Sequence, residues 1–115
     1  MKYMLMFTSN RDDRAETPPE EVKAMYERIG QWWGEHASAG RILGGEELQG
    51  ADTAATVHNA GGDQAVVTDG PFIEAKETIG GYAIVDVASR DEALAMARTW
   101  PAGGSVEVRP VVQAH

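Results

Sequence analysis

The stretch from residue 1 to residue 7 constrains the fold most, because both of its alternating faces are apolar. In an extended chain, Tyr3, Leu5 and Phe7 fall on one side, and two methionines fall on the other. Apolar residues on both sides are typical of a strand whose sheet is covered on both faces. Residues 1–7 therefore predict a strand inside a sheet, with a further layer of protein on each side.

Two amphipathic helices are predicted, and each begins with a capping signal. Thr17–Glu20 reads as a capping box, with its threonine as the N-cap and its first proline at the first helical position. Apolar residues then recur at helical spacing as far as Gly40, a natural left-handed C-terminal residue. A second capping box, Ser89–Glu92, opens a shorter helix that ends before Pro101.

The other strands are predicted from short runs of alternating or continuous apolar residues. They cover Thr53–Asn59, Gln64–Thr68, Gly81–Val87 and Ser105–Val112. The segment Arg41–Asp52 is predicted to be a glycine-rich connection. The resulting order, β-α-β-β-β-α-β, predicts a single ferredoxin-like α+β domain over residues 1–115, with an inserted hairpin. Both helices should cover one face of the sheet, because crossover connections are right-handed.

The uncovered face of such a sheet predicts self-association. Two helices cannot bury both faces of an apolar strand, and a large apolar surface is unusual on a monomer. Packing two copies face to face would form a dimeric α+β barrel. We therefore expect a homodimer.

Composition excludes several classes of function. The formal net charge of −8 argues against binding to nucleic acid or to an anionic membrane. The chain has no cysteine, and its three histidines show no metal-ligand spacing, so we expect neither metal nor cofactor. No segment is long enough to cross a membrane, and the apolar N-terminal run is too short for a signal peptide. We expect a cytoplasmic protein that binds an unknown small molecule.

The run from residue 67 to residue 82 reads VTDGPFIEAKETIGGY and contains more than a turn requires. Gly70, before a proline, is expected to need a backbone conformation that a side chain resists. Asp69 has two interpretations: a turn residue that caps the following amides, or an acid–base group partly buried under Phe72. Lys76 either orients an anionic substrate or pairs with neighbouring glutamates.

This run resembles the signature of the YCII-related superfamily, in particular its DGPF-domain branch. Similar stretches are KYML at residues 2–5, GGEEL at 44–48 and VEVRP at 106–110, so the resemblance covers nearly the whole chain. It implies a dimeric α+β barrel. In YCII-type relatives, a histidine on the first helix and an aspartate in the later loop are proposed as a catalytic pair. The aspartate corresponds to Asp69, but the histidine would fall near Ile29, where this chain departs from the pattern.

His36 is the candidate substitute for the missing histidine. It lies two turns further along the same helical stripe, where it could act as a general base held by Asp69 or Glu46. The alternative is a histidine at the helix end that is exposed or bonded to a carbonyl. Trp33 is expected in the core. Trp32 is expected at the edge of the stripe, where it could face a flat ligand.

The resemblance leaves two classes of function open. One is a cofactor-free enzyme that transfers protons in a cleft beside the barrel, like a lyase, an isomerase or a dehydrochlorinase. Its catalytic residues would be Asp69 and His36. Its substrate-binding residues would be Trp32, Glu46, Phe72 and Lys76. The other class is a non-catalytic ligand-binding or regulatory module linked to sigma-factor-dependent transcription. A closed cleft that holds Asp69 and a base would favour the enzyme.

Overall fold

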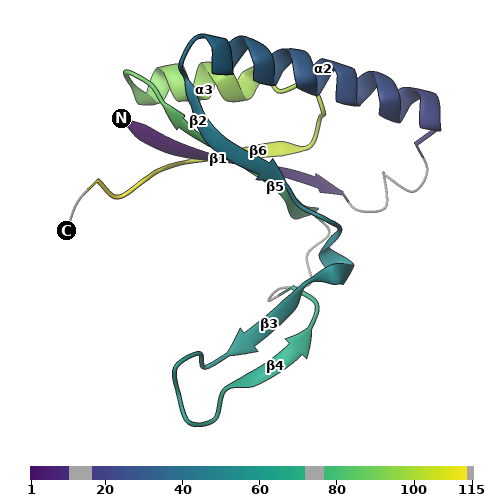
Figure 1. Ribbon diagram of the computed structural model, residues 1–115, viewed down its shortest axis with the longest axis vertical. Coiled ribbons are helices and arrows are strands. Elements are labelled where there is room, and N and C mark those ends of the chain that lie inside the picture. Colours follow the sequence, from purple (N-terminus) through teal and green to yellow (C-terminus); the bar gives the residue numbers. More distant parts are fainter. Residues whose placement is uncertain (11–16, 72–76, 114–115) are drawn as a thin grey trace.

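The computed structural model describes residues 1–10, 17–71 and 77–113 (Figure 1). The elements follow one another as β1 (Lys2–Asn10), α2 (Pro19–Ser38), β2 (Ile42–Glu47), the 3-10 turn η1 (Ala51–Thr53), β3 (Ala55–His58), β4 (Val66–Asp69), β5 (Glu77–Asp86), α3 (Arg90–Arg98) and β6 (Ser105–Pro110). This is a ferredoxin-like α+β fold in which the hairpin β3–β4 is inserted between β2 and β5. The predicted ferredoxin-like α+β fold is confirmed, and the dimeric barrel stays a prediction.

The main sheet has the strand order β2-β5-β1-β6, and every neighbouring pair is antiparallel. Both helices lie on one face of this sheet (Figure 1). The alternation predicted for β1 is confirmed: Tyr3, Leu5 and Phe7 are buried in the core, whereas Met4 and Met6 are half-buried on the other face. The core is therefore a single layer between the sheet and the helices.

The segment Arg41–Asp52 was predicted as a connection, and this prediction is wrong for Ile42–Glu47, which is the edge strand β2. This strand pairs with β5, with a bulge between Ile42 and Gly44. Two consecutive glycines, Gly44 and Gly45, favour a turn by local preference. Here Gly45 instead permits close packing, because a Cβ at this position would collide with the carbonyl of Tyr82. The tertiary contact overrides the local preference.

The first helix begins one residue later than predicted, because Pro18 and not Thr17 is its N-cap. Pro18 is the N-cap residue and makes no side-chain capping bond, and Pro19 is the first helical residue. The cause is the pair of prolines. A residue before proline is excluded from the helical region, so Pro18 is extended at φ −59° and ψ 145°. The helix therefore cannot begin before Pro19.

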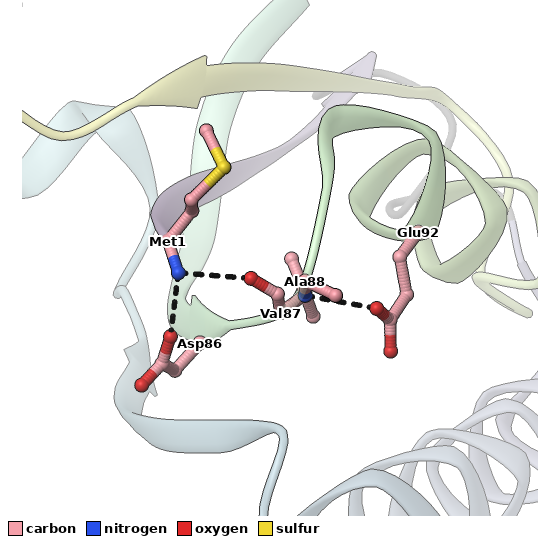
Figure 2. Close-up of polar contacts among 5 residues, drawn as sticks. All are labelled: Met1, Asp86, Val87, Ala88 and Glu92. Atoms are coloured by element: carbon pink, nitrogen blue, oxygen red, sulfur yellow. Dashed lines mark hydrogen bonds and ion pairs between the residues drawn. The ribbon is translucent and has the colours of Figure 1, made fainter.

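The second capping box and two of the predicted turn glycines are confirmed. Ser89 Oγ accepts a hydrogen bond from the backbone N–H of Glu92 at 3.2 Å. The carboxylate of Glu92 accepts one from the N–H of Ala88 at 2.9 Å, one residue before the N-cap whose N–H a capping box uses (Figure 2). Gly40 and Gly70 have φ angles of +76° and +97°, a region that favours glycine.

The start of β1 is tied to the end of β5 by the backbone amine of Met1. This ammonium donates to Asp86 Oδ1 at 3.0 Å and to the carbonyl of Val87 at 2.9 Å (Figure 2). These bonds lie beside the capping box of α3, so strand and helix are fixed to the same corner of the fold. No helix in the described part of the chain is long and apolar enough to cross a membrane.

Replacing Gly45 by alanine should destabilise the fold, because the new methyl group would meet the Tyr82 carbonyl and lie 2.7 Å from the ring of Trp33. We expect Gly45→Ala to lower the free energy of unfolding by about 1–3 kcal/mol, as overpacking does in cores. Gly44→Ala is the matched control, since a Cβ there meets no atom within 4 Å. Urea denaturation of both variants measures the difference, and equal midpoints would contradict the close packing at Gly45.

Candidate functional site

A cleft of about 600 Å³ lies between α2 and the end of the sheet formed by β2 and β5. Its volume is that of a site for a small organic molecule. Apolar side chains make up most of its wall, and they come from β1, from α2 and from the segment after α3. The large apolar lining residues are Phe7, Val22, Met25, Ile29, Trp33 and Trp100.

An aromatic cluster fixes one wall of the cleft. The rings of Phe7 and Trp100 are stacked, with centroids 3.8 Å apart and planes 15° apart. Trp32 meets both rings edge-on, at 5.8 Å from Phe7 and 5.1 Å from Trp100. The indole N–H of Trp32 donates to Thr99 Oγ1 at 2.9 Å, which satisfies its one polar group inside the core. The buried indole of Trp32 therefore packs against Phe7 and Trp100 and fixes their positions in the wall.

The two adjacent tryptophans exchange their predicted places. Trp32, predicted at the edge of the helical stripe, is only 5% exposed and belongs to the core. Trp33, predicted in the core, is half-buried and lines the cleft. Consecutive residues point about 100° apart on a helix, so a small rotation of the helix decides which one faces the sheet. Contact with Phe7 and Trp100 selects Trp32.

Polar groups gather at the end of the cleft formed by β2. The hydroxyl of Tyr26, on α2, donates to Glu47 Oε1 at 2.6 Å. Glu46 and Glu47 both line the cleft and both are exposed. Backbone of Gly80 and Gly81 completes this end. Successive strand residues point to opposite faces of a sheet, so Glu47 presents its carboxylate on the helix side together with the phenol of Tyr26. Glu46 pairs with Tyr82 and points to the other face.

The structure places the predicted catalytic pair outside this cleft. Asp69 ends β4 on the inserted hairpin and is exposed, whereas His36 lies near the end of α2 (Figure 1). Within a single chain, Asp69 and His36 therefore do not lie close to each other. Among the predicted binding residues, Glu46 lines the cleft and Trp32 stands behind its wall. Phe72 and Lys76 lie outside the described residues.

His36 has a structural partner of its own. Its Nδ1 accepts a hydrogen bond from Arg41 Nε at 2.9 Å, and its ring meets Trp32 edge-on at 4.7 Å. Burial lowers the pKa of His36 below its ordinary value of 6.5, and the neighbouring charge of Arg41 lowers it further, while Glu35 acts in the opposite direction. His36 therefore favours the neutral form, in which Nδ1 can accept this bond.

Three residues that line the cleft were not singled out from the sequence: Tyr26, Glu47 and Trp100. Tyr26 was visible as part of the apolar stripe of the helix, one turn before Ile29. Glu47 could not be placed, because its strand was read as a connection. Within the described ranges, no cluster of three or more His, Cys, Asp or Glu side chains could hold a metal ion. The arrangement can bind an apolar molecule and exchange a proton at one end of it.

These features define a class: a ferredoxin-like α+β chain with a ligand-sized cleft between its first helix and its sheet. The family model for the YCII-related domain matches residues 1–115, and the chain belongs to this family. It is 40% identical over 80 residues to Uncharacterized protein R00369 of Rhizobium meliloti (strain 1021). That match covers 66% of this chain and 64% of the relative, so it spans less than two thirds of the relative's length. Membership of the DGPF branch stays a prediction.

Protonation of His36 should destabilise the fold. Below pH 6.5 the unfolded chain takes up this proton more readily than the folded chain, so the contribution of His36 to stability is complete above that pH and is lost as the pH falls. We expect the urea midpoint to drop between pH 7.5 and pH 5.5, and to drop less in His36→Gln. An NMR titration of the His36 ring should give a pKa below 6.5. An identical pH dependence in both proteins would contradict the burial of this ring.

Proposed function

We propose that this protein binds a small, flat and mostly apolar organic molecule in the cleft beside α2. The observation that carries the proposal is the wall formed by Trp33, Trp100 and Phe7 along a cleft of about 600 Å³. Aromatic rings that are already packed lose little freedom when they bind a flat ligand, so most of the contact energy contributes to affinity.

The polar residues at the β2 end of the cleft determine which polar group of a ligand fits there. Glu47 is an acceptor when ionised, and the hydroxyl of Tyr26 is already directed at it. A ligand that carries a hydrogen-bond donor or a positive charge at one end fits this arrangement best. A carboxylate at the same place would meet the like charge of Glu47.

A second candidate function is proton transfer on the bound ligand, and the Tyr26–Glu47 hydrogen bond favours it. At 2.6 Å this bond joins a proton donor to a carboxylate at the edge of an apolar cleft. Glu47 would accept a proton from the ligand, and Tyr26 would stabilise the group that remains. This assignment replaces Asp69 and His36, which one chain leaves apart, as the acid–base residues.

The binding proposal can be tested with two small probes of similar shape and opposite charge, 2-phenylethylamine and 3-phenylpropionate. The three tryptophans give three indole N–H signals in a ¹H–¹⁵N spectrum. We expect 2-phenylethylamine at millimolar concentration to shift the signals of Trp33 and Trp100 more than that of Trp32, which is buried. The anionic probe should have a weaker effect, and Glu47→Gln should reduce the difference between the probes.

Glu35→Gln is the matched control, because it removes the same charge from an exposed position of α2 outside the cleft. It should leave the response to both probes unchanged. Absence of a response to either probe would contradict a preformed ligand site, and equal responses to both would contradict the role of the Glu47 carboxylate.

Proton transfer can be tested with 5-nitrobenzisoxazole, which opens when any suitably placed base removes its ring proton and which releases a coloured phenolate. We expect turnover above the buffer rate, a large loss in Glu47→Gln, and no loss in Glu35→Gln. A rate that is the same in the wild-type chain and in Glu47→Gln would exclude Glu47 as a base, while leaving the binding proposal standing.

A further inference from the structure

The inserted hairpin lies apart from the rest of the fold. Strand β3 pairs with β4 in a separate two-stranded sheet. Figure 1 shows that this hairpin extends away from the main sheet on the side opposite the two helices. At its base, the N–H of Gly70 donates to the carbonyl of Ala54, and Thr56 Oγ1 donates to the carbonyl of Gly70, both at 2.7 Å. A two-stranded hairpin without a covering layer is marginal in water, so its apolar side chains need a partner.

The two faces of the hairpin differ in chemistry. On one face Val57 and Val67 are directly opposite each other and are 51% and 65% exposed. On the other face the polar side chains satisfy one another, since His58 Nε2 and Thr68 Oγ1 are hydrogen-bonded at 2.9 Å. Exposed β-branched residues opposite each other are the usual contact surface of a strand pair. The face of the hairpin that carries Val57 and Val67 is therefore the one that another surface would bury.

The main sheet has an uncovered face on the same side as the hairpin (Figure 1). Met4 lies opposite Ile84 and Met6 opposite Tyr82 on this face, and all four side chains are only half-buried. The charged groups around them are balanced, since Lys2 lies opposite Asp86 and Glu46 lies opposite Tyr82 on the same face. Arg109 pairs with Glu107 at 2.6 Å, and the ammonium of Met1 pairs with Asp86 at 3.0 Å. On a chain of net charge −8, this face can meet a copy of itself without strong repulsion.

The chain exposes more surface than a compact monomer of the same mass. The chain exposes 8069 Å². A compact monomer of 12.4 kDa exposes about 6,100 Å². Its radius of gyration is 16.1 Å, against about 13 Å for a compact domain of this length. The excess of about 2,000 Å² per chain is an upper limit on the surface that a partner could cover. Covering about half of it on each of two chains would bury about 2,000 Å², where the range of obligate homodimers begins.

We infer that the hairpin β3–β4 is a dimerisation arm. A second copy of this chain lies in the angle between the open sheet face and the hairpin, and the Val57–Val67 face of the arm packs against it. The predicted homodimer thus gains a second contact surface that the sheets alone do not supply. The inference does not depend on the ligand proposed for the cleft.

The experiment compares neighbouring valines on opposite faces of one strand. Val67→Lys places a charge on the covered face, and Val66→Lys places the same charge on the other face, from a position that is also exposed at 53%. We expect the wild-type chain to sediment as a dimer. Val67→Lys should raise the dissociation constant of the dimer about tenfold or more, because an ammonium is costly to bury without a partner. Val66→Lys should leave the constant unchanged.

A second measurement uses the absence of cysteine, which allows a single spin label at residue 67 or residue 66. The label on Val67→Cys should be immobilised in the dimer and should become mobile on dilution, while the label on Val66→Cys should be mobile throughout. A monomeric wild-type chain would overturn the inference. A Val67→Lys dimer as tight as the wild type, or a mobile label at residue 67 in the dimer, would overturn the arm while leaving a sheet-to-sheet dimer.

Discussion

The burial of one indole ring is the contact on which the rest of the fold depends. Trp32 is the buried residue of α2, and it meets Phe7 of β1, Trp100 beyond α3 and the hydroxyl of Thr99. The remaining apolar residues of this helix lie less deeply. Trp32 therefore fixes the helix to the sheet at one point, and the part of the helix before it stands off from the strands. The cleft lies in the space that results.

Those parts of the fold that depend on regular periodicity could be predicted from the sequence. The alternation in β1 gave the correct inward residues, and the second capping box gave the start of α3. Prediction failed where one residue's preference was overridden by its neighbours or by tertiary contact. Gly45 lies in a strand because Trp33 and Tyr82 leave no room for a side chain, and Pro18 is kept out of the helix by Pro19. No local sequence pattern indicates the close contact at Gly45.

The candidate site was predicted only in part, for a related reason. Glu46 was singled out and lines the cleft, but Glu47 and Tyr26 become neighbours only once β2 is known to be a strand. Ile29, which replaces the histidine expected from the family resemblance, also lines the cleft. At this position the wall of the cleft is therefore apolar. An apolar wall suits ligand contact better than it suits an acid–base residue.

The place of β1 in the sheet has a consequence for how the chain acquires its structure. β1 is the first strand of the chain and lies between β5 and β6, with Leu5 opposite both Ala83 and Val108. Ala83 and Val108 lie 78 and 103 residues after Leu5, so the central strand gains its two neighbours only after long loops close. During synthesis β1 therefore stays unpaired, with both apolar faces exposed, until β5 and then β6 have left the ribosome. Folding should accordingly be slower than that of a helical bundle of equal length.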